Sequence, residues 1–456
     1  MKRLLVLALV LGIIMVSAAC SKKTDTKKVS NNLKKTSKTT AKEMKQESSH
    51  FGFMPATLDF DSARQAGGNW DRPFFELFGW GQIERSPGEF DFTEPDDYVR
   101  AAQENDFNIL ANIQPFAAWD QEANEGKFPE VQSPDLRGGR TRAKPNDLEA
   151  YSKFVKRLVE RYDGDGRDDM PDLKYPIRYW EVANEPEMQN PPLTFFQGPP
   201  EDYFEILKKT YEAVKSADPK AKVLNGGMAG MQDFMTEYWQ GVFDLGGGKY
   251  FDIANIHSIG HGEPLNIPEF KDFLAKNNID KPIWVTEVQI EDRRDKQTEE
   301  QYADSLARSY IYALANGVDK LFYVNLKLPD QGLPAEGEGG PGFSDLSTLI
   351  SEVGEQQPLF HVHKVIFETL DKPFTAEKIA EEINTTEAGA NRKITVGHYK
   401  FTVDGRIIYA LWGGTSLPAE ITGKVSVTDM NGNKEEKDAS EITLTESPIF
   451  VETRQD

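Results

Sequence analysis

From residue 51 onward, short apolar segments alternate with segments whose apolar residues recur at helical spacing. In the segment 147–162, apolar side chains return every three or four residues and would line one face of a helix. A second helical pattern, at 299–318, ends at Asn316-Gly317, a typical helix stop. The segments that we expect to form strands are 51–56, 74–80, 108–116, 177–184, 222–228, 251–258, 282–288 and 320–325.

This alternation predicts the fold class. Eight parallel strands, each followed by a helix, are typical of an α/β fold in which the strands close into a (β/α)8 TIM barrel. After residue 370 the pattern changes to short strands separated by turn signals such as Asn431-Gly432, which indicates a small antiparallel β-sandwich domain. We therefore expect a barrel at residues 49–372 and a C-terminal β-domain at residues 373–456.

The first 20 residues are typical of an export signal. A basic start is followed by an apolar run from Leu4 to Val16, which is too short to span a membrane. Cys20 is the only cysteine and follows the small residues 17–19, so the segment resembles a bacterial lipoprotein signal, in which this cysteine carries the lipid. The alternative is ordinary cleavage that leaves a free thiol.

The charge distribution separates a tether from an acidic body. Residues 21–48 are rich in Lys, Ser and Thr and have almost no large apolar side chain, so we expect a flexible tether. The chain carries a net charge of −21, although residues 21–50 contain nine Lys and three acidic residues, so the body is more acidic than the whole. Such a body repels nucleic acid. We expect a monomer held by its lipid on a cell membrane, facing the cell surface or the periplasm.

Two acidic residues end strands that we expect in the barrel. Glu185, within Asn184-Glu185-Pro186, follows the fourth strand, and Glu287 ends the seventh. The active site of such a barrel lies at the C-terminal ends of its strands, so both carboxyl groups should meet at one mouth. Glycosidic bond cleavage uses two carboxyl groups, one protonating the leaving oxygen and one attacking carbon or activating water. The alternative for each is a loop cap or an ion pair.

These residues carry a resemblance to a known group of enzymes. The chain resembles the clan A glycoside hydrolases, retaining enzymes built on this barrel, in its Asn184-Glu185-Pro186 motif and in Glu287. The stretch WGQIERSPGEFDF at 80–92 also resembles a segment that follows the second strand of these enzymes. The resemblance implies that Glu185 is the general acid/base, that Glu287 is the nucleophile and that Asn184 binds the sugar 2-OH.

The resemblance extends to further residues. Arg72 aligns with an arginine that keeps the nucleophile ionised, because a nearby guanidinium lowers a carboxyl pKa. His257 stands where an aromatic residue commonly contacts the nucleophile, and Trp119, after the third strand, could stack on a sugar face. The alternatives are an ion pair for Arg72, a structural histidine for His257 and a core position for Trp119. The family often has a Trp at the end of the eighth strand, whereas this chain has Asn325.

Two loops have compositions that suggest further roles. The loop 162–170 holds four Asp residues, Asp163, Asp165, Asp168 and Asp169, around two Gly. Such an oxygen-rich turn suits a structural Ca²⁺, and a solvated acidic turn is the alternative. The hydrolysis itself would need no cofactor. The Gly- and Pro-rich segment 327–357 is expected to overhang the sugar site.

We therefore expect a retaining glycoside hydrolase that cleaves β-glycosidic bonds of a plant or microbial polysaccharide or oligosaccharide through a covalent glycosyl-enzyme intermediate. β-Mannan, xylan, β-glucan and short β-glycosides are all candidate substrates. Two alternatives stay open. The chain could be a non-catalytic glycan-binding surface lipoprotein on a glycosidase-like barrel, or a surface interaction module whose acidic body serves solubility.

Lipidation of Cys20 is testable by cell fractionation. Cys20→Ala removes the thiol that would carry the acyl chain, so the protein should move from the membrane fraction to the soluble fraction on an immunoblot. Ser21→Ala leaves the thiol in place and should stay with the membranes. A Cys20→Ala variant that also stays there would contradict lipid anchoring.

Overall fold

The computed structural model describes residues 44, 47–131, 136–191, 193–290, 298–327, 347–351, 353–385 and 392–453. Three sequence predictions therefore concern parts outside the described residues: the signal segment with Cys20, nearly all of the tether and most of the segment 327–357. Within the described part, no helix is both long enough and apolar enough to cross a membrane.

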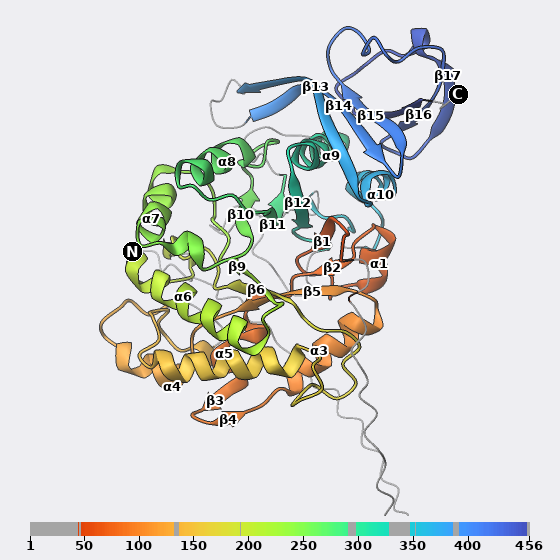
Figure 1. Cartoon of the computed structure of the whole chain (residues 1–456). Coiled ribbons are helices and arrows are strands. Elements are labelled where there is room, and N and C mark those ends of the chain that lie inside the picture. Colours follow the sequence, from red (N-terminus) through yellow and green to blue (C-terminus); the bar gives the residue numbers. More distant parts are fainter. Residues whose placement is uncertain are drawn as a thin grey trace, which may run out of the picture.

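Eight parallel strands surround a common axis and form the predicted barrel (Figure 1). Parallel bridges from Leu224 to Ile253 and from Met228 to Ile256 join the first and last strands of the sheet order, so the barrel is closed. The strands are β1 (Phe51–Phe53), β2 (Trp70–Asp71), β5 (Asn108–Ile113), β6 (Tyr179–Val182), β9 (Lys222–Asn225), β10 (Ala254–Ile259), β11 (Ile283–Gln289) and β12 (Val318–Tyr323).

Helices follow the strands and coat the outside of the barrel (Figure 1). The two helices predicted most clearly have side-chain caps: the Asp147 carboxylate accepts the first free amides of α5, and Thr298 with Gln301 forms a capping box at α9. The helices are α1 (Phe60–Gln65), α3 (Thr93–Glu104), α5 (Leu148–Tyr162), α6 (Pro200–Ala217), α7 (Asp233–Asp244), α8 (Ile267–Lys276), α9 (Glu299–Ala315) and α10 (Pro358–Leu370).

The position predicted for the second strand is wrong. The strand was expected at 74–80, but β2 ends at Asp71 and the expected segment begins a 3-10 helix, η1 (Phe75–Phe78). Pro73 lies between them, and its missing N–H cannot join a sheet ladder. Phe78 is completely buried in the core, so the apolar residues here reflect packing of a turn. A short apolar run does not distinguish these cases.

The stretch 80–92 forms a compact unit after β2. Glu84 accepts hydrogen bonds from the Trp80 indole at 2.7 Å and from the Gly88 amide at 2.6 Å, which explains the spacing of these three residues. The smaller elements of the chain are α2 (Trp80–Ile83), β3 (Glu84–Ser86), β4 (Glu89–Phe90), α4 (Ala118–Gln121), η2 (Glu122–Asn124), η3 (Leu136–Gly138), β7 (Gln189–Asn190), β8 (Leu193–Thr194), η4 (Gly247–Lys249) and η6 (Ala439–Glu441).

A separate apolar cluster fills the barrel near the N-terminal ends of its strands. A buried lysine, Lys320, places its ammonium 4.5 Å from the Trp70 ring centroid and 5.2 Å from that of Trp284. The same ammonium donates to the carbonyl oxygens of Glu47 and Ser49, so the start of the body closes this end. Burial lowers the pKa of Lys320 to about 8. The cluster comprises Trp70, Leu110, Tyr179, Leu224, Ile253, Trp284 and Phe322.

The C-terminal strands form a second, antiparallel domain beside α9 and α10 (Figure 1). The predicted barrel with a C-terminal β-sandwich domain is thus confirmed, and the expected boundary at residue 372 falls between α10 and β13. Asn431-Gly432 forms the turn of the β16–β17 hairpin, with Gly432 at φ +84°. The strands are β13 (Phe374–Thr385), β14 (Arg392–Val403), β15 (Arg406–Trp412), β16 (Lys424–Asp429), β17 (Lys434–Asp438) and β18 (Ile449–Thr453).

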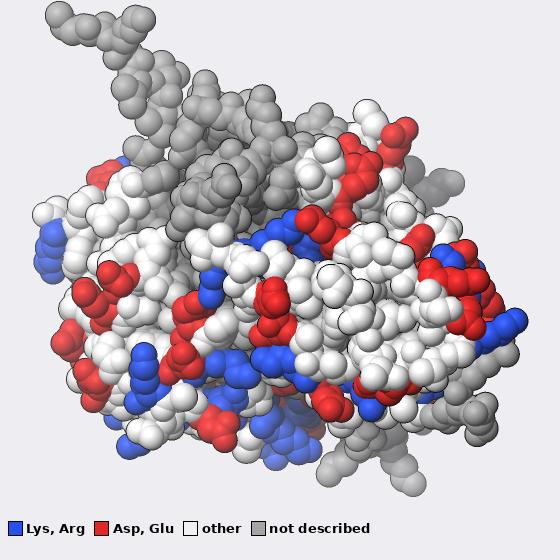
Figure 2. Space-filling view, turned by 90° about the horizontal axis from the view of Figure 1, so that it is seen from above, with Lys and Arg blue, Asp and Glu red and all other residues white. Residues whose placement is uncertain are grey.

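The surface mixes charges of both signs. On the face shown in Figure 2, Lys and Arg side chains lie between Asp and Glu side chains rather than in one basic field. Exposed large apolar side chains of the described residues come from different elements, so they are scattered singly. They are Phe234, Leu245, Val353 and Ile379.

A buried ion pair joins the two domains. Glu263, in the loop after β10, accepts hydrogen bonds from Arg308 of α9 at 2.6 and 2.9 Å. The other Glu263 oxygen accepts the Ile394 amide of β14 at 2.7 Å, and Arg308 donates to the Glu446 carbonyl at 2.7 Å. Both charged side chains are almost completely buried. Each charge is therefore satisfied by partners from both domains.

Breaking this pair should destabilise the protein. Arg308→Leu leaves the Glu263 carboxylate buried without its counter-ion, so the free energy of unfolding should fall by about 3 kcal/mol. Urea unfolding measures this change. Arg100→Ala removes the exposed pair with Asp97 and should cost less than about 1 kcal/mol. Equal losses of unfolding free energy for the two variants would show that the buried Glu263–Arg308 pair stabilises the protein no more than an exposed pair does.

Candidate active site

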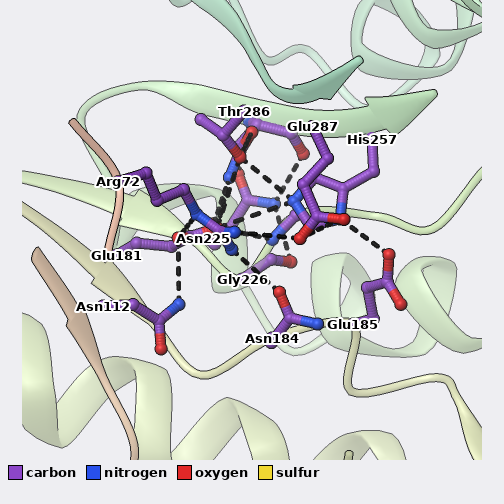
Figure 3. Close-up of polar contacts among 12 residues, drawn as sticks. Arg72, Asn112, Glu181, Asn184, Glu185, Asn225, Gly226, His257, Thr286 and Glu287 are labelled. Carbon is purple, nitrogen blue, oxygen red and sulfur yellow. Dashed lines mark hydrogen bonds and ion pairs between the residues drawn. The ribbon is translucent and has the colours of Figure 1, made fainter. Parts of the chain in front are cut away.

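Glu185 and Glu287 meet at the C-terminal end of the barrel, with His257 between them (Figure 3). One carboxylate oxygen of each Glu and one ring nitrogen of His257 all lie within 4.8 Å of one another. His257 Nδ1 is 2.7 Å from Glu185 Oε1 and 3.5 Å from Glu287 Oε1. The fourth, sixth and seventh barrel strands thus bring the predicted residues together, and all three side chains are buried.

The backbone that carries Glu185 is strained. Pro186 favours an extended conformation for the preceding residue, yet Glu185 has φ +39° and Ala183 has φ +60°. Non-glycine residues in this region typically cost about 1–3 kcal/mol and persist only when their surroundings hold them. Here the Ala183 amide donates to the Ile113 carbonyl, and the Met188 amide donates to the Glu185 carbonyl, both at 2.9 Å. The turn aims the Glu185 side chain at His257.

The Arg72 side chain bridges the carboxyl groups of Glu181 and Glu287. Its Nε donates to Glu181 at 2.6 Å, its Nη1 to Glu287 at 2.9 Å and its Nη2 to the Asn184 side-chain oxygen at 2.8 Å. The guanidinium is completely buried. Arg72 therefore forms the ion pair named as its alternative role, and the same side chain also contacts Glu287 and Asn184.

Glu181, which the sequence analysis missed, is the centre of this network. One oxygen accepts from Arg72 and from Asn112, and the other accepts from Asn255 at 2.7 Å and from the Gly227 amide at 3.3 Å. Burial alone would raise the pKa of Glu181, but Arg72, with help from His257, lowers it to about 2. Glu181 is therefore ionised at neutral pH.

A chain of hydrogen bonds fixes the proton on one nitrogen of His257. Its Nε2 lies 3.0 Å from the Thr286 hydroxyl, which donates its own proton to Asn255 at 2.8 Å. Because the hydroxyl has one proton, His257 Nε2 must be the donor to Thr286. The other nitrogen, Nδ1, faces the Glu185 carboxyl group at 2.7 Å.

The charged groups of the site shift the pKa values of His257 and Glu287. Burial lowers the pKa of His257, but Glu287, Glu181 and Glu185 outweigh burial and raise it to about 10. Burial raises the pKa of Glu287, and although His257 and Arg72 counteract it, the pKa stays above its ordinary value. The site thus brings two cationic side chains, Arg72 and His257, against the carboxyl groups of Glu181, Glu185 and Glu287.

The side-chain nitrogen of Asn184 is free to donate a hydrogen bond to a ligand. The Asn184 oxygen is held by Arg72, whereas the Nδ2 atom has no hydrogen-bond partner among the described residues. The residue is 1% exposed. A buried amide donor without a partner typically costs about 1–3 kcal/mol, so a ligand oxygen that accepted from it would recover this energy.

Trp119 lies outside this cluster. It belongs to α4, its indole donates to the Glu84 carbonyl at 2.9 Å, and its ring meets the Trp80 ring edge-on at 4.8 Å between centroids. The half-buried ring therefore supports the stretch 80–92. Stacking of Trp119 on a sugar stays a prediction.

The acidic loop after α5 is held by its own backbone. Asp169 accepts the amides of Gly164 and Gly166 at 3.0 and 2.7 Å, and Asp163 accepts that of Asp165. Carboxylate oxygens of Glu160, Asp163 and Asp165 lie within 4.8 Å of one another, which suits an oxygen-liganded cation. Burial raises the pKa of Asp163 to about 7. Calcium at this loop stays a prediction.

The residues that the sequence analysis missed share one signal. Each is a buried polar residue within a barrel strand whose other residues are mostly apolar. Gly227 belongs to the same layer, because a Cβ there would lie 2.1 Å from the His257 ring. The missed side chains are Asn255 and, labelled in Figure 3, Asn112, Glu181, Asn225 and Thr286.

Comparisons with known proteins agree with this arrangement at the level of the fold. No protein-family model matches the chain, and no curated protein matches it. A family 39 glycoside hydrolase from Bacteroides cellulosilyticus WH2 superimposes with a TM-score of 0.62 at 17% identity, covering 91% of this chain and 83% of that chain. The two chains share the barrel fold.

Two further solved structures show the same likeness. A monomeric β-xylosidase from Caulobacter crescentus CB15 has a TM-score of 0.55 at 13% identity, covering 90% of this chain and 96% of that chain. A family 51 α-L-arabinofuranosidase, AbfB from Bifidobacterium longum, has a TM-score of 0.55 at 13% identity, covering 91% of this chain and 97% of that chain. At such identities the likeness establishes the fold alone.

The depressed pKa of Glu181 makes a prediction about stability. A carboxyl group that ionises near pH 2 when folded and near pH 4.5 when unfolded stabilises the fold by about 3 kcal/mol at neutral pH. Glu181→Gln should lose this contribution at pH 7. The difference from the wild type should shrink as pH falls from 4.5 toward 2, where the wild-type carboxyl takes up its proton. Urea unfolding at several pH values measures it. A difference that does not change with pH would contradict the ionised Glu181.

Proposed function

We propose that the protein is a retaining glycoside hydrolase that cleaves β-glycosidic bonds by double displacement. The observation that carries this proposal is the approach of Glu185 and Glu287, whose nearest carboxylate oxygens lie within 4.8 Å at the barrel mouth. Retaining enzymes hold their carboxyl groups roughly 5–5.5 Å apart, whereas inverting enzymes need roughly 6.5–9.5 Å to admit a water. The short separation favours direct attack by one carboxylate.

The surroundings of each carboxyl group support a division of roles. Glu287 would be the nucleophile, because the Arg72 guanidinium at 2.9 Å favours its ionised form. Glu185 would be the general acid/base, because it lies 2.7 Å from His257 Nδ1 and has no contact with Arg72 among the described residues.

The two chemical steps follow from these roles. In the first step, a Glu287 oxygen bonds to the anomeric carbon while the glycosidic oxygen leaves with the proton from Glu185. In the second step, the Glu185 carboxylate takes a proton from water, the hydroxide oxygen bonds to the anomeric carbon, and Glu287 is released. Atoms and charges balance, and Glu185 regains its proton.

Asn184 would orient the sugar for this chemistry. Its oxygen is fixed by Arg72, so its unpartnered Nδ2 can donate only from one direction. A 2-OH that accepts this hydrogen bond would hold the anomeric carbon over Glu287. Such bonds strengthen in the transition state and add to catalysis.

The solved structures with this fold support a carbohydrate substrate. Their names include a glucosidase from Croceicoccus marinus, besides the β-xylosidase and the arabinofuranosidase. We infer a plant or microbial polysaccharide or oligosaccharide as substrate. A lipidated Cys20 and the tether would hold this enzyme at the membrane surface, where it would degrade carbohydrate. A non-catalytic glycan-binding lipoprotein is the alternative, and turnover distinguishes the two.

The division of roles predicts different defects in two alanine variants. Glu287→Ala should abolish hydrolysis of every glycoside, because no covalent intermediate can form. Glu185→Ala should spare the first step for 2,4-dinitrophenyl β-glycosides, whose leaving group needs no proton, and azide should restore the second step as a glycosyl azide. Release of dinitrophenol and product analysis measure both effects.

A matched control is Glu237→Ala, which removes an exposed carboxylate on the outer helix α7 and should keep full activity. Equal residual activity in Glu185→Ala and Glu287→Ala would refute the assigned roles. A wild-type protein that binds β-glycosides without hydrolysing them would favour the glycan-binding alternative.

A further inference from the structure

An aromatic pair stands at the barrel mouth where the sequence resemblance provides none. The end of the eighth strand, where the family often has Trp, carries the buried Asn325. Two half-buried phenylalanines lie elsewhere on the rim: Phe75 in η1, after the second strand, and Phe195, after the β7–β8 hairpin that follows the fourth strand. Their rings meet edge to face, with centroids 5.8 Å apart and planes at 76°.

Contacts connect Phe75 directly to the reacting groups. The Arg72 guanidinium carbon lies 5.1 Å from the centroid of the Phe75 ring. The same guanidinium contacts Glu287 at 2.9 Å and Asn184 at 2.8 Å. Phe75 therefore covers the cation that holds both the proposed nucleophile and the residue proposed to bind the 2-OH.

The chemistry of the ring indicates what it could bind. Phe has no hydrogen-bonding group, so its accessible surface favours an apolar partner, and the C–H face of a pyranose ring is the apolar surface of a sugar. The edge-to-face contact with Phe195 limits rotation of Phe75 and lowers the entropy lost on binding. A rigid, partly exposed ring beside two carboxyl groups is suited to stacking.

We propose that Phe75, braced by Phe195, is the stacking platform for the glycone, the sugar ring that becomes bonded to Glu287. The glycone is assigned because Phe75 lies against Arg72 on the side of Glu287, whereas the leaving group takes its proton from Glu185. The proposal rests on the proposed glycosidase function. It makes these two residues of the second- and fourth-strand loops determinants of glycone affinity.

The test compares four variants on substrates that share a glycone. The probes are 4-nitrophenyl β-xyloside and β-glucoside, with xylobiose and cellobiose as matched disaccharides. Phe75→Ala should lower kcat/KM about ten- to hundred-fold, mainly through KM, and by the same factor for aryl glycoside and disaccharide. Phe75→Tyr keeps the ring and should stay near the wild type. Phe195→Ala should show a smaller loss in the same direction.

The matched control is Phe234→Ala, on α7 and 49% exposed, which should change nothing. If Phe75→Ala behaves like this control, the platform is refuted while the glycosidase function stands. A loss confined to the disaccharides would move Phe75 to the leaving-group side and overturn the glycone assignment. A shifted acidic limb of the pH profile with unchanged KM would mean that Phe75 only positions Arg72, which also overturns the platform.

Binding measurements separate failure of this proposal from failure of the function. If the wild type hydrolyses none of the probes, calorimetric titration with xylobiose and cellobiose replaces kinetics. Binding by the wild type that Phe75→Ala loses supports the platform without turnover, and absence of binding refutes a platform for xylose or glucose while the dinitrophenyl β-glycosides still test the function. If Phe75→Ala does not fold, Phe75→Leu, which keeps apolar volume without the aromatic ring, should show the same loss of affinity.

Discussion

The buried ion pair between Arg72 and Glu181 is the constraint on which the site depends. Both side chains are completely buried, and a buried charge is tolerated only when its hydrogen-bonding capacity is met. Arg72 uses its remaining donors on Glu287 and Asn184, and Glu181 accepts from Asn112 of β5 and Asn255 of β10. Satisfying this one pair therefore brings the second, fourth and seventh strands into a single arrangement.

The barrel interior is divided into two layers as a result. An apolar layer of aromatic side chains fills the N-terminal end, where Lys320 is satisfied by ring faces and by the carbonyls of Glu47 and Ser49. The polar layer above it supports His257 and the acidic pair. Because side chains and backbone groups of other strands hold the polar layer, the strained turn at Glu185 can persist. The apolar layer supplies stability, and the polar layer supplies orientation and charge.

The C-terminal domain extends this support to the rim of the barrel. Glu263 lies six residues after His257 in the chain, and its carboxylate joins α9 to the amide of Ile394. The loop that continues the sixth strand is thus fixed on both sides, by its own strand and by β14. On the opposite rim, Phe75 and Phe195 hold each other through their rings. Both rims are therefore set by contacts between segments far apart in the sequence.

The sequence by itself determined the barrel, the two-domain order and the positions of Glu185 and Glu287, because alternation of strands and helices and an acid at a strand end are local patterns. Only the tertiary structure decided the place of β2, since two strand residues carry no periodicity and a buried turn uses the same apolar side chains. The roles of Glu181 and Phe75 also became recognisable only in the tertiary structure. The partner atoms of Glu181 come from other strands, 109 residues away for Arg72, and the Phe75 ring obtains its role from a cation and a ring that only folding places beside it.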